Sequence, residues 1–291
     1  MIGDIIKLLR IKQYYKNLVV YLPLVFSGNL LNFEYLILTC IGFLSLCMVS
    51  SSNYILNDII DRKSDLLNKE KRARPVSSGR IPVWLAVLLM ILLLLGSILI
   101  SARLSRIFLV MVGSLFISGT LYSLFFRKEP FLDVLGISIN FVIRAVSGAF
   151  ILSVYLSPWL ILCPFFLALF LAVGKRKSEM LFLGKKAKLH RPSLGYYSKE
   201  VTDNLMVVST SLLIISYSLY CFLSIQKVSL ILTLPVLIYA VFRYNFLIDS
   251  SSAIARHPEK IIFDTRSLLT ILIWGSLVLI IIYFPPFSFF S

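Results

Sequence analysis

The chain has 291 residues, of which 58% are hydrophobic and only 15% are charged, and its mean hydropathy is +0.90. This composition excludes an ordinary soluble domain and predicts an integral membrane protein. Lys and Arg outnumber Asp and Glu by 15, but the cations gather beside apolar runs. That arrangement is typical of membrane orientation, so we expect no nucleic-acid partner.

Runs of about twenty apolar residues predict nine transmembrane helices. These expected spans cover residues 17–31, 35–57, 82–101, 107–126, 132–153, 158–174, 204–224, 228–248 and 267–284. The first is short and is interrupted by Pro23 and Gly28, and a surface helix is expected to precede it. We therefore expect an all-α integral membrane protein that forms one domain over residues 1–291.

The distribution of charge predicts the orientation of this helical bundle. If the N-terminus lies inside, the only cations on the outer side are Arg103, Arg106 and Lys227. Because Lys and Arg accumulate in cytoplasmic loops, we expect a cytoplasmic N-terminus and an external C-terminus in the cell (inner or plasma) membrane. Nearly all acids fall on the same inner side, and the positive-inside rule does not require this. A reaction site is therefore expected at the cytoplasmic face.

The strongest chemical signal follows the second expected span, in the segment NDIIDRKSD. Helical spacing places Asn57, Asp58, Asp61 and Asp65 on one face, within about 100° of each other. Crowded carboxylates repel one another unless a cation lies among them, and oxygen ligands of this kind suit Mg²⁺ with a diphosphate. We predict that Asn57 and the three aspartates bind this metal and that the aspartates are catalytic. The alternative is a solvated helix end whose acids pair with neighbouring Lys and Arg.

Cations follow this stripe in the next loop, where Lys71 and Arg74 are the best candidates for binding phosphate oxygens. Within the fifth expected span, Arg144 must face a polar cavity or a partner because it lies inside an apolar helix. The alternative for the loop cations is the ordinary cytoplasmic bias of Lys and Arg.

A second inner cluster ends the sixth expected span in the segment GKRKSEM. It contains Lys175, Arg176 and Glu179, and the loop beyond contains Tyr196, and we count all four as candidate substrate-binding residues. Lys175 and Glu179 lie one helical turn apart, so a local ion pair is the alternative reading.

The segment NDIIDRKSD, followed by RPVSSGRI, is similar to the first aspartate-rich motif of the UbiA prenyltransferase superfamily. Members of that superfamily are nine-helix membrane enzymes with a cytoplasm-facing active-site cavity, and they bind diphosphate substrates through Mg²⁺. The resemblance covers nearly the whole chain. It departs from the prenyl-transferring majority at the second motif, where DxxxD is usual and this chain reads GKRKSEM.

The segments RIKQYYKN, KRARP, FVIRAVSG and GKRKSE together resemble a narrower branch, the polyprenyl-phosphate phosphoribosyltransferases. This resemblance implies that 5-phosphoribose passes from phosphoribosyl pyrophosphate to a polyprenyl phosphate, with Mg²⁺ or Mn²⁺ bound at the acidic stripe. It also implies that Lys175 and Arg176 hold the 5-phosphate of the donor, and that the acceptor phosphate is held by Lys16, Lys71 and Arg144. Two alternatives remain open, a prenyltransferase that uses a polyprenyl diphosphate and a membrane protein that is a transporter or scaffold.

Overall fold

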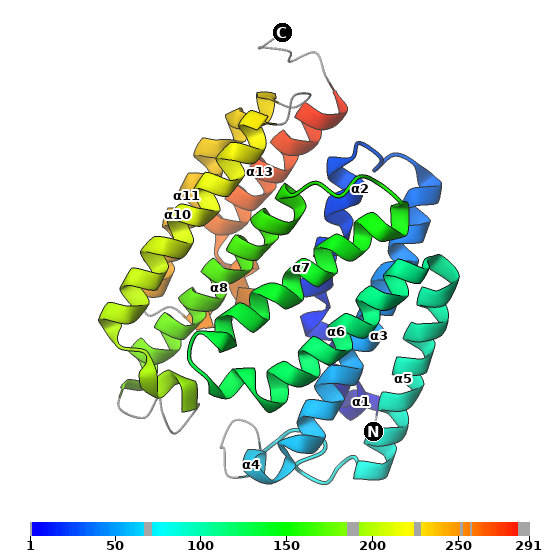
Figure 1. Ribbon diagram of the computed structural model, residues 1–291. Coiled ribbons are helices and arrows are strands. Elements are labelled where there is room, and N and C mark those ends of the chain that lie inside the picture. The colour runs from blue at the N-terminus through cyan, green and yellow to red at the C-terminus, as the bar shows by residue number, and fades with distance from the viewer. Residues whose placement is uncertain are drawn as a thin grey trace. The chain divides into compact units, whose positions relative to one another are not determined.

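The computed structural model describes residues 2–66, 72–184, 192–223, 228–250, 253–256 and 258–284, and the regular structure in these ranges is helical (Figure 1). Eight helical segments of this described part are long and apolar enough to cross a membrane. They are α3 (Phe33–Ile60), α5 (Val83–Leu104), α6 (Arg106–Leu124), α7 (Leu132–Leu152), α8 (Trp159–Leu183), α10 (Lys199–Leu223), α11 (Leu234–Asp249) and α13 (Thr265–Tyr283). Short 3₁₀ turns extend two of these segments, η2 (Phe126–Lys128) after α6 and η5 (Val228–Thr233) before α11. The chain is therefore a multi-pass membrane protein, and the last eight expected spans are confirmed as helices.

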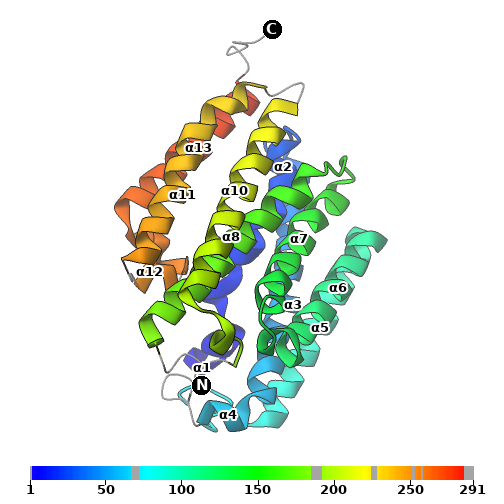
Figure 2. The same ribbon diagram turned by 60° about the vertical axis from the view of Figure 1, so that its left-hand side comes forward.

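The first expected span differs from the other eight. Residues 17–31 do not form one α-helix: the 3₁₀ helix η1 (Ile11–Tyr21) leads into the short helix α2 (Leu22–Phe26). The preceding helix, α1 (Ile2–Leu9), and α2 lie at opposite ends of this part of the chain in both views (Figures 1 and 2). Polar side chains in η1, together with Pro23 at the start of α2, explain why an unbroken apolar helix does not form here.

The chain divides into two compact units, and it passes from one to the other within α7. The first unit comprises residues 1–127 and 140–156, and the second comprises residues 128–139 and 157–291. The expectation of one domain over the whole chain stays a prediction.

Serine side chains join two long helices of the first unit. Ser45 of α3 lies 2.9 Å from the Ser97 hydroxyl and 2.8 Å from the Ser101 hydroxyl, both on α5. Small residues let membrane helices approach closely, and their hydroxyl groups find partners in each other. A second close approach joins η1 to α7, where a Cβ on Gly148 would collide with the carbonyl oxygen of Val20. The N-terminal segment is thus fixed against the bundle despite its irregular helix.

The second unit is organised around α8, α10 and α11. Its core includes Phe170 and Val173 of α8, Leu213 of α10, and Tyr244 and Ile248 of α11. Helix α13 also belongs to this unit, together with the shorter elements η4 (Pro192–Tyr196), η5, α12 (Ala253–Arg256) and η6 (Pro258–Phe263). The long helices therefore supply the frame on which this unit's polar side chains are held.

Two helices run further than the sequence predicts, and both extensions carry candidate residues. Helix α3 continues to Ile60, and α4 (Arg62–Leu66) follows it after one residue. Helix α8 continues to Leu183, about nine residues beyond the expected end of its span. The candidates of the GKRKSEM segment therefore lie on a helix and not in a loop.

Candidate functional site

The acidic stripe, defined as Asn57, Asp58, Asp61 and Asp65, lies where α3 meets α4. Asn57 and Asp58 belong to the last turn of α3, Asp61 is its C-terminal cap, and Asp65 belongs to α4. All three aspartates are buried, with exposed fractions of 1%, 7% and 3% in chain order. Because isolated buried carboxylates are unfavourable, partners of opposite charge are required.

Arg74 and Arg10 supply two of these partners. The Arg74 guanidinium donates to Oδ1 of Asp58 at 3.0 Å and to Oδ2 of Asp65 at 2.8 Å, so it bridges the two aspartates. Arg10 donates to the same Oδ1 of Asp58 at 2.5 Å and stacks over the Tyr54 ring. Arg10 adopts a left-handed backbone conformation, with φ of 52°, at the junction between α1 and η1. That turn positions its side chain at the stripe.

Arg127 of η2 supplies the third partner. Its two terminal nitrogens donate to both carboxylate oxygens of Asp61, and one of them also donates to Oδ1 of Asn57 at 3.0 Å. This two-pronged contact is the geometry that a planar guanidinium favours with a carboxylate. Neither Arg10 nor Arg127 is predicted as a site residue from the sequence, because both belong to segments far from the stripe; Arg10 enters only as the first residue of the segment RIKQYYKN. Their signal was their charge on the same predicted side, which does not identify the partner.

The stripe has the right donor atoms for a hard divalent cation, since it combines carboxylate and amide oxygens. In their present positions these oxygens face guanidinium groups, and the described residues contain no group of three acid, histidine or cysteine side chains placed to hold a metal ion. A metal would thus take the place that the arginines now have.

Arg144 forms a second polar centre in the first unit. It is 8% exposed, and it donates to Oδ1 of Asn17 at 2.7 Å and to the carbonyl oxygen of Asn140 at 2.8 Å. Asn17 is in turn held by Ser50 and Cys47. No carboxylate pairs with Arg144 among the residues that the structure describes. A buried guanidinium held only by neutral groups favours the binding of an anion.

Three other predicted residues have different fates. Lys16 lies on η1, with its Nζ 5.9 Å from the centre of the Tyr15 ring. Lys71 lies outside the described residues, so its predicted phosphate contact is not placed. Tyr196 points to the surface with 66% exposure, whereas its neighbour Tyr197 is buried.

A network of buried polar groups surrounds Asp133 in the second unit. The Asp133 carboxylate accepts from Arg176 at 2.6 Å, from the Tyr197 hydroxyl at 2.6 Å and from the Ser193 hydroxyl at 3.1 Å. Burial and the hydrogen bond to Asp133 raise the pKa of Tyr197 well above its usual range. These contacts join the start of α7, the end of α8 and the residues around η4. Asp133 and Tyr197 were missed in the sequence because neither belongs to a recognisable motif.

Arg176 is central to this Asp133 network. It is 1% exposed, and it also donates to Oε2 of Glu179 at 2.9 Å. The predicted phosphate contact of Arg176 stays a prediction, and its side chain is already bonded to two carboxylates. Lys175 differs, because its side chain is 38% exposed and its Nζ lies 3.9 Å from Glu179. The local ion pair expected as the alternative is thus present, at the limit of contact.

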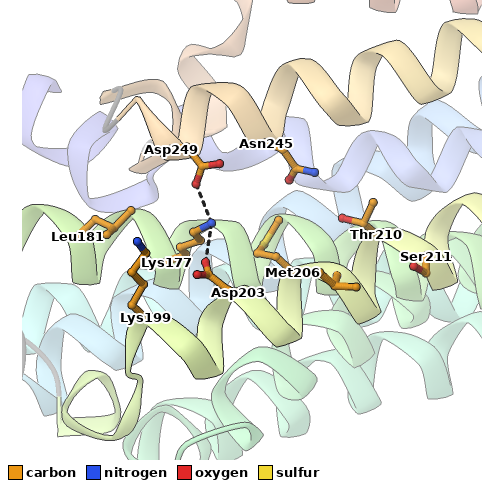
Figure 3. A pocket seen from close by; sticks show the side chains of 10 residues that line it. Lys177, Leu181, Lys199, Asp203, Met206, Thr210, Ser211, Asn245 and Asp249 are labelled. Carbon is orange, nitrogen blue, oxygen red and sulfur yellow. Dashed lines mark ion pairs between the residues drawn. The ribbon is translucent and has the colours of Figure 1, made fainter.

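A separate pocket of about 640 Å³ lies in the second unit (Figure 3). Lys177 of α8 spans its polar end, at 2.8 Å from Asp203 of α10 and 2.7 Å from Asp249 of α11. Met206 and Leu181 add apolar surface to its wall. None of the predicted site residues lines this pocket.

Comparison with known proteins identifies the family. The UbiA prenyltransferase family matches residues 19–259. A decaprenyl-phosphate phosphoribosyltransferase from Mycolicibacterium smegmatis is 28% identical over 98% of this chain and 94% of its own length. A protein of the same name from Corynebacterium glutamicum is 29% identical over 97% of this chain and 87% of its own length.

A solved structure supports the same fold. It is a UbiA homologue from Archaeoglobus fulgidus bound to GPP and Mg²⁺, and it superposes with a TM-score of 0.72. The match is 23% identical in sequence and covers 94% of this chain and 99% of the homologue. The family model covers most of the chain, and the solved homologue shares its fold. The chain therefore belongs to the UbiA prenyltransferase family.

Proposed function

We propose that this protein transfers 5-phosphoribose from phosphoribosyl pyrophosphate to a polyprenyl phosphate and releases pyrophosphate. The main support is the likeness to decaprenyl-phosphate phosphoribosyltransferases, which extends over nearly the full length of this chain. The residues of the GKRKSEM segment agree with this choice. A prenyl diphosphate donor that is held by a second metal ion needs several acids in this segment. Glu179 is the only acid of the GKRKSEM segment, and it contacts Lys175 and Arg176.

The acidic stripe is the proposed binding site for the diphosphate of the donor, together with Mg²⁺ or Mn²⁺. Asn57, Asp58, Asp61 and Asp65 would hold the metal, which supplies charge neutralisation for the leaving pyrophosphate. Arg74 is suited to the phosphate oxygens, because its planar fork matches them as well as it matches carboxylates. In the reaction, the bond from the anomeric carbon to the pyrophosphate oxygen breaks, and the electron pair leaves with pyrophosphate.

The acceptor phosphate forms the new bond to the anomeric carbon through one of its oxygens. It is already ionised at neutral pH, so orientation and charge neutralisation matter more than a general base. Arg144 is the proposed anchor for this phosphate, because it is a buried cation held by neutral groups. Lys16 and Lys71 are predicted to assist. For the 5-phosphate of the donor, Lys175 is the better candidate, since Arg176 is bonded to Asp133 and Glu179.

A second reaction has one specific observation in its favour. The homologue from Archaeoglobus fulgidus binds GPP, a prenyl diphosphate, with Mg²⁺. A UbiA-type enzyme of that kind would move a polyprenyl group from its diphosphate to an aromatic or other small acceptor. The acidic stripe would serve either donor, so the two reactions differ in what the protein consumes.

A direct assay separates the two reactions. The purified full-length protein is incubated with Mg²⁺ and labelled phosphoribosyl pyrophosphate, and polyprenyl phosphates of several lengths are offered as acceptors. Label is expected in the lipid fraction, and it should disappear when the metal is chelated. Consumption of a prenyl diphosphate with no use of phosphoribosyl pyrophosphate would refute the proposal. The Asp61→Asn variant, prepared in the same way, serves as the inactive control.

A further inference from the structure

Three arginines from separate segments of the first unit meet at the acidic stripe. Arg10 comes from the junction of α1 and η1, Arg74 from the loop before α5, and Arg127 from η2. Each lies within hydrogen-bond distance of an aspartate of the stripe. Three guanidinium groups thus face three carboxylates, and their formal charges cancel. Among the residues that the structure describes, the arginines thus balance the charge of the stripe before any ligand binds.

The arginines engage oxygens that a metal ion would need. Arg127 contacts both oxygens of Asp61 and the side-chain oxygen of Asn57. Oδ1 of Asp58 is shared by Arg10 and Arg74. A cation that coordinates these atoms must therefore replace arginine contacts, because an oxygen that accepts two charged donors has no room for a metal at bonding distance.

The charges favour joint binding of metal and diphosphate. A divalent cation alone would add two positive charges to a buried cluster that is already balanced, which is unfavourable. A metal–diphosphate complex instead brings phosphate oxygens, and these can accept the hydrogen bonds that the arginines give up. Arginine suits this exchange because its planar fork matches both carboxylate and phosphate.

We propose that Arg10 and Arg127 act as exchangeable counter-ions of the stripe: they hold its oxygens without metal and turn to the diphosphate when metal binds. Metal and diphosphate then bind cooperatively, and each raises the affinity for the other by the same factor. The inference rests on the proposed metal–diphosphate role of the stripe, which is common to both transfer reactions. It adds two diphosphate-binding residues that lie outside the aspartate-rich motif.

The test measures binding and needs neither a sugar donor nor a lipid. Full-length protein in nanodiscs is titrated with Mn²⁺ alone and, separately, with a preformed complex of Mn²⁺ and inorganic pyrophosphate. Calorimetry follows both titrations, and electron paramagnetic resonance reports free Mn²⁺ in the first. The wild-type protein should bind Mn²⁺ alone weakly and the complex tightly.

Arg127→Gln should change the two affinities in opposite directions. Binding of Mn²⁺ alone should tighten by about tenfold or more, because a competing cation is removed, and binding of the complex should weaken by about the same factor. Arg10→Gln should likewise tighten the binding of Mn²⁺ alone and weaken the binding of the complex. A merely structural role would lower both, so the opposite signs are the signature of exchange.

Arg243→Gln is the matched control. Arg243 also holds a carboxylate with two nitrogens, at 3.1 and 2.7 Å from the oxygens of Asp264, but it belongs to the second unit and its carboxylate partner is not an aspartate of the stripe. It should leave both affinities unchanged.

The inference is overturned if Arg127→Gln binds Mn²⁺ alone no more tightly than the wild-type protein does, or if wild-type affinity for Mn²⁺ does not depend on pyrophosphate. If Arg127→Gln does not fold, Arg10→Gln decides by the same criterion. Failure of phosphoribosyl transfer would leave this result intact, and failure of the exchange would leave the transfer reaction intact.

Discussion

Replacing Arg176 by Met should destabilise the protein far more than the same replacement of its neighbour Lys175. Arg176 is 1% exposed and joins Asp133 to Glu179, and the Asp133 carboxylate is fully buried. Breaking a buried ion pair by removing one partner costs about 3–5 kcal/mol, because the other charge stays buried. The exposed pair of Lys175 with Glu179, at 3.9 Å, is worth roughly 0–1 kcal/mol.

The difference between the two variants is therefore about 2–5 kcal/mol. At roughly 2 °C per kcal/mol for a chain of this size, Arg176→Met should unfold about 4–10 °C below Lys175→Met. Thermal unfolding of the purified proteins in one detergent, followed by circular dichroism, measures this gap. Adding Asp133→Asn to Arg176→Met should recover part of the loss, because Asn carries no charge and its amide oxygen can still accept from the Tyr197 hydroxyl.

Equal unfolding temperatures for the two single variants would refute this reasoning. Arg176 would then be free to serve the substrate, as its position in GKRKSEM suggests. A deficit that Asp133→Asn deepens would also contradict the account, because it would mean that the buried Asp133 charge is not the source of the loss.

Four further outcomes are expected. Asp61→Asn should lower turnover by at least about a hundredfold, the scale of one strong electrostatic contact, and its elution on size exclusion should match that of the wild-type protein. Lys175→Ala should raise the KM for phosphoribosyl pyrophosphate by roughly 10- to 150-fold with little change for the lipid, and equal KM values would exclude Lys175 as the 5-phosphate contact. The hydrogen bond from Arg243 holds the pKa of Asp264 well below its usual range, so this pair stabilises the fold above pH about 4 and is lost as the pH falls. Asp264→Asn keeps the helix cap but loses the ion pair with Arg243, so its unfolding temperature at pH 7 should be below that of the wild-type protein. The difference should narrow in acid, and a difference that does not change with pH would contradict the pairing. Reporter fusions should place the N-terminus inside and the C-terminus outside, and finding both on one side would show that residues 11–26 do not cross.

The sequence by itself determined the apolar spans and the acidic stripe, because both are local patterns. A run of twenty apolar residues must be helical in a bilayer, where backbone groups have no water to bond. The spacing of Asn57, Asp58, Asp61 and Asp65 fixes their common face through helical geometry alone. At residues 17–31 the local pattern predicts an apolar span but not its form, since the hydropathy of a segment does not reveal that η1 is a 3₁₀ helix packed against α3 and α7.

Only the tertiary structure decided which charges meet. Arg10 and Arg127 reach aspartates 48 and 66 residues away, and Asp133 reaches Arg176 across 43 residues. The sequence placed these groups on one side of the membrane, but every Lys and Arg of the inner segments was then an equal candidate. The choice among them depends on helix lengths, on the left-handed turn at Arg10 and on which face of α8 is buried. Coulombic attraction acts between any pair of opposite charges, so the packing of the helices selects the partners.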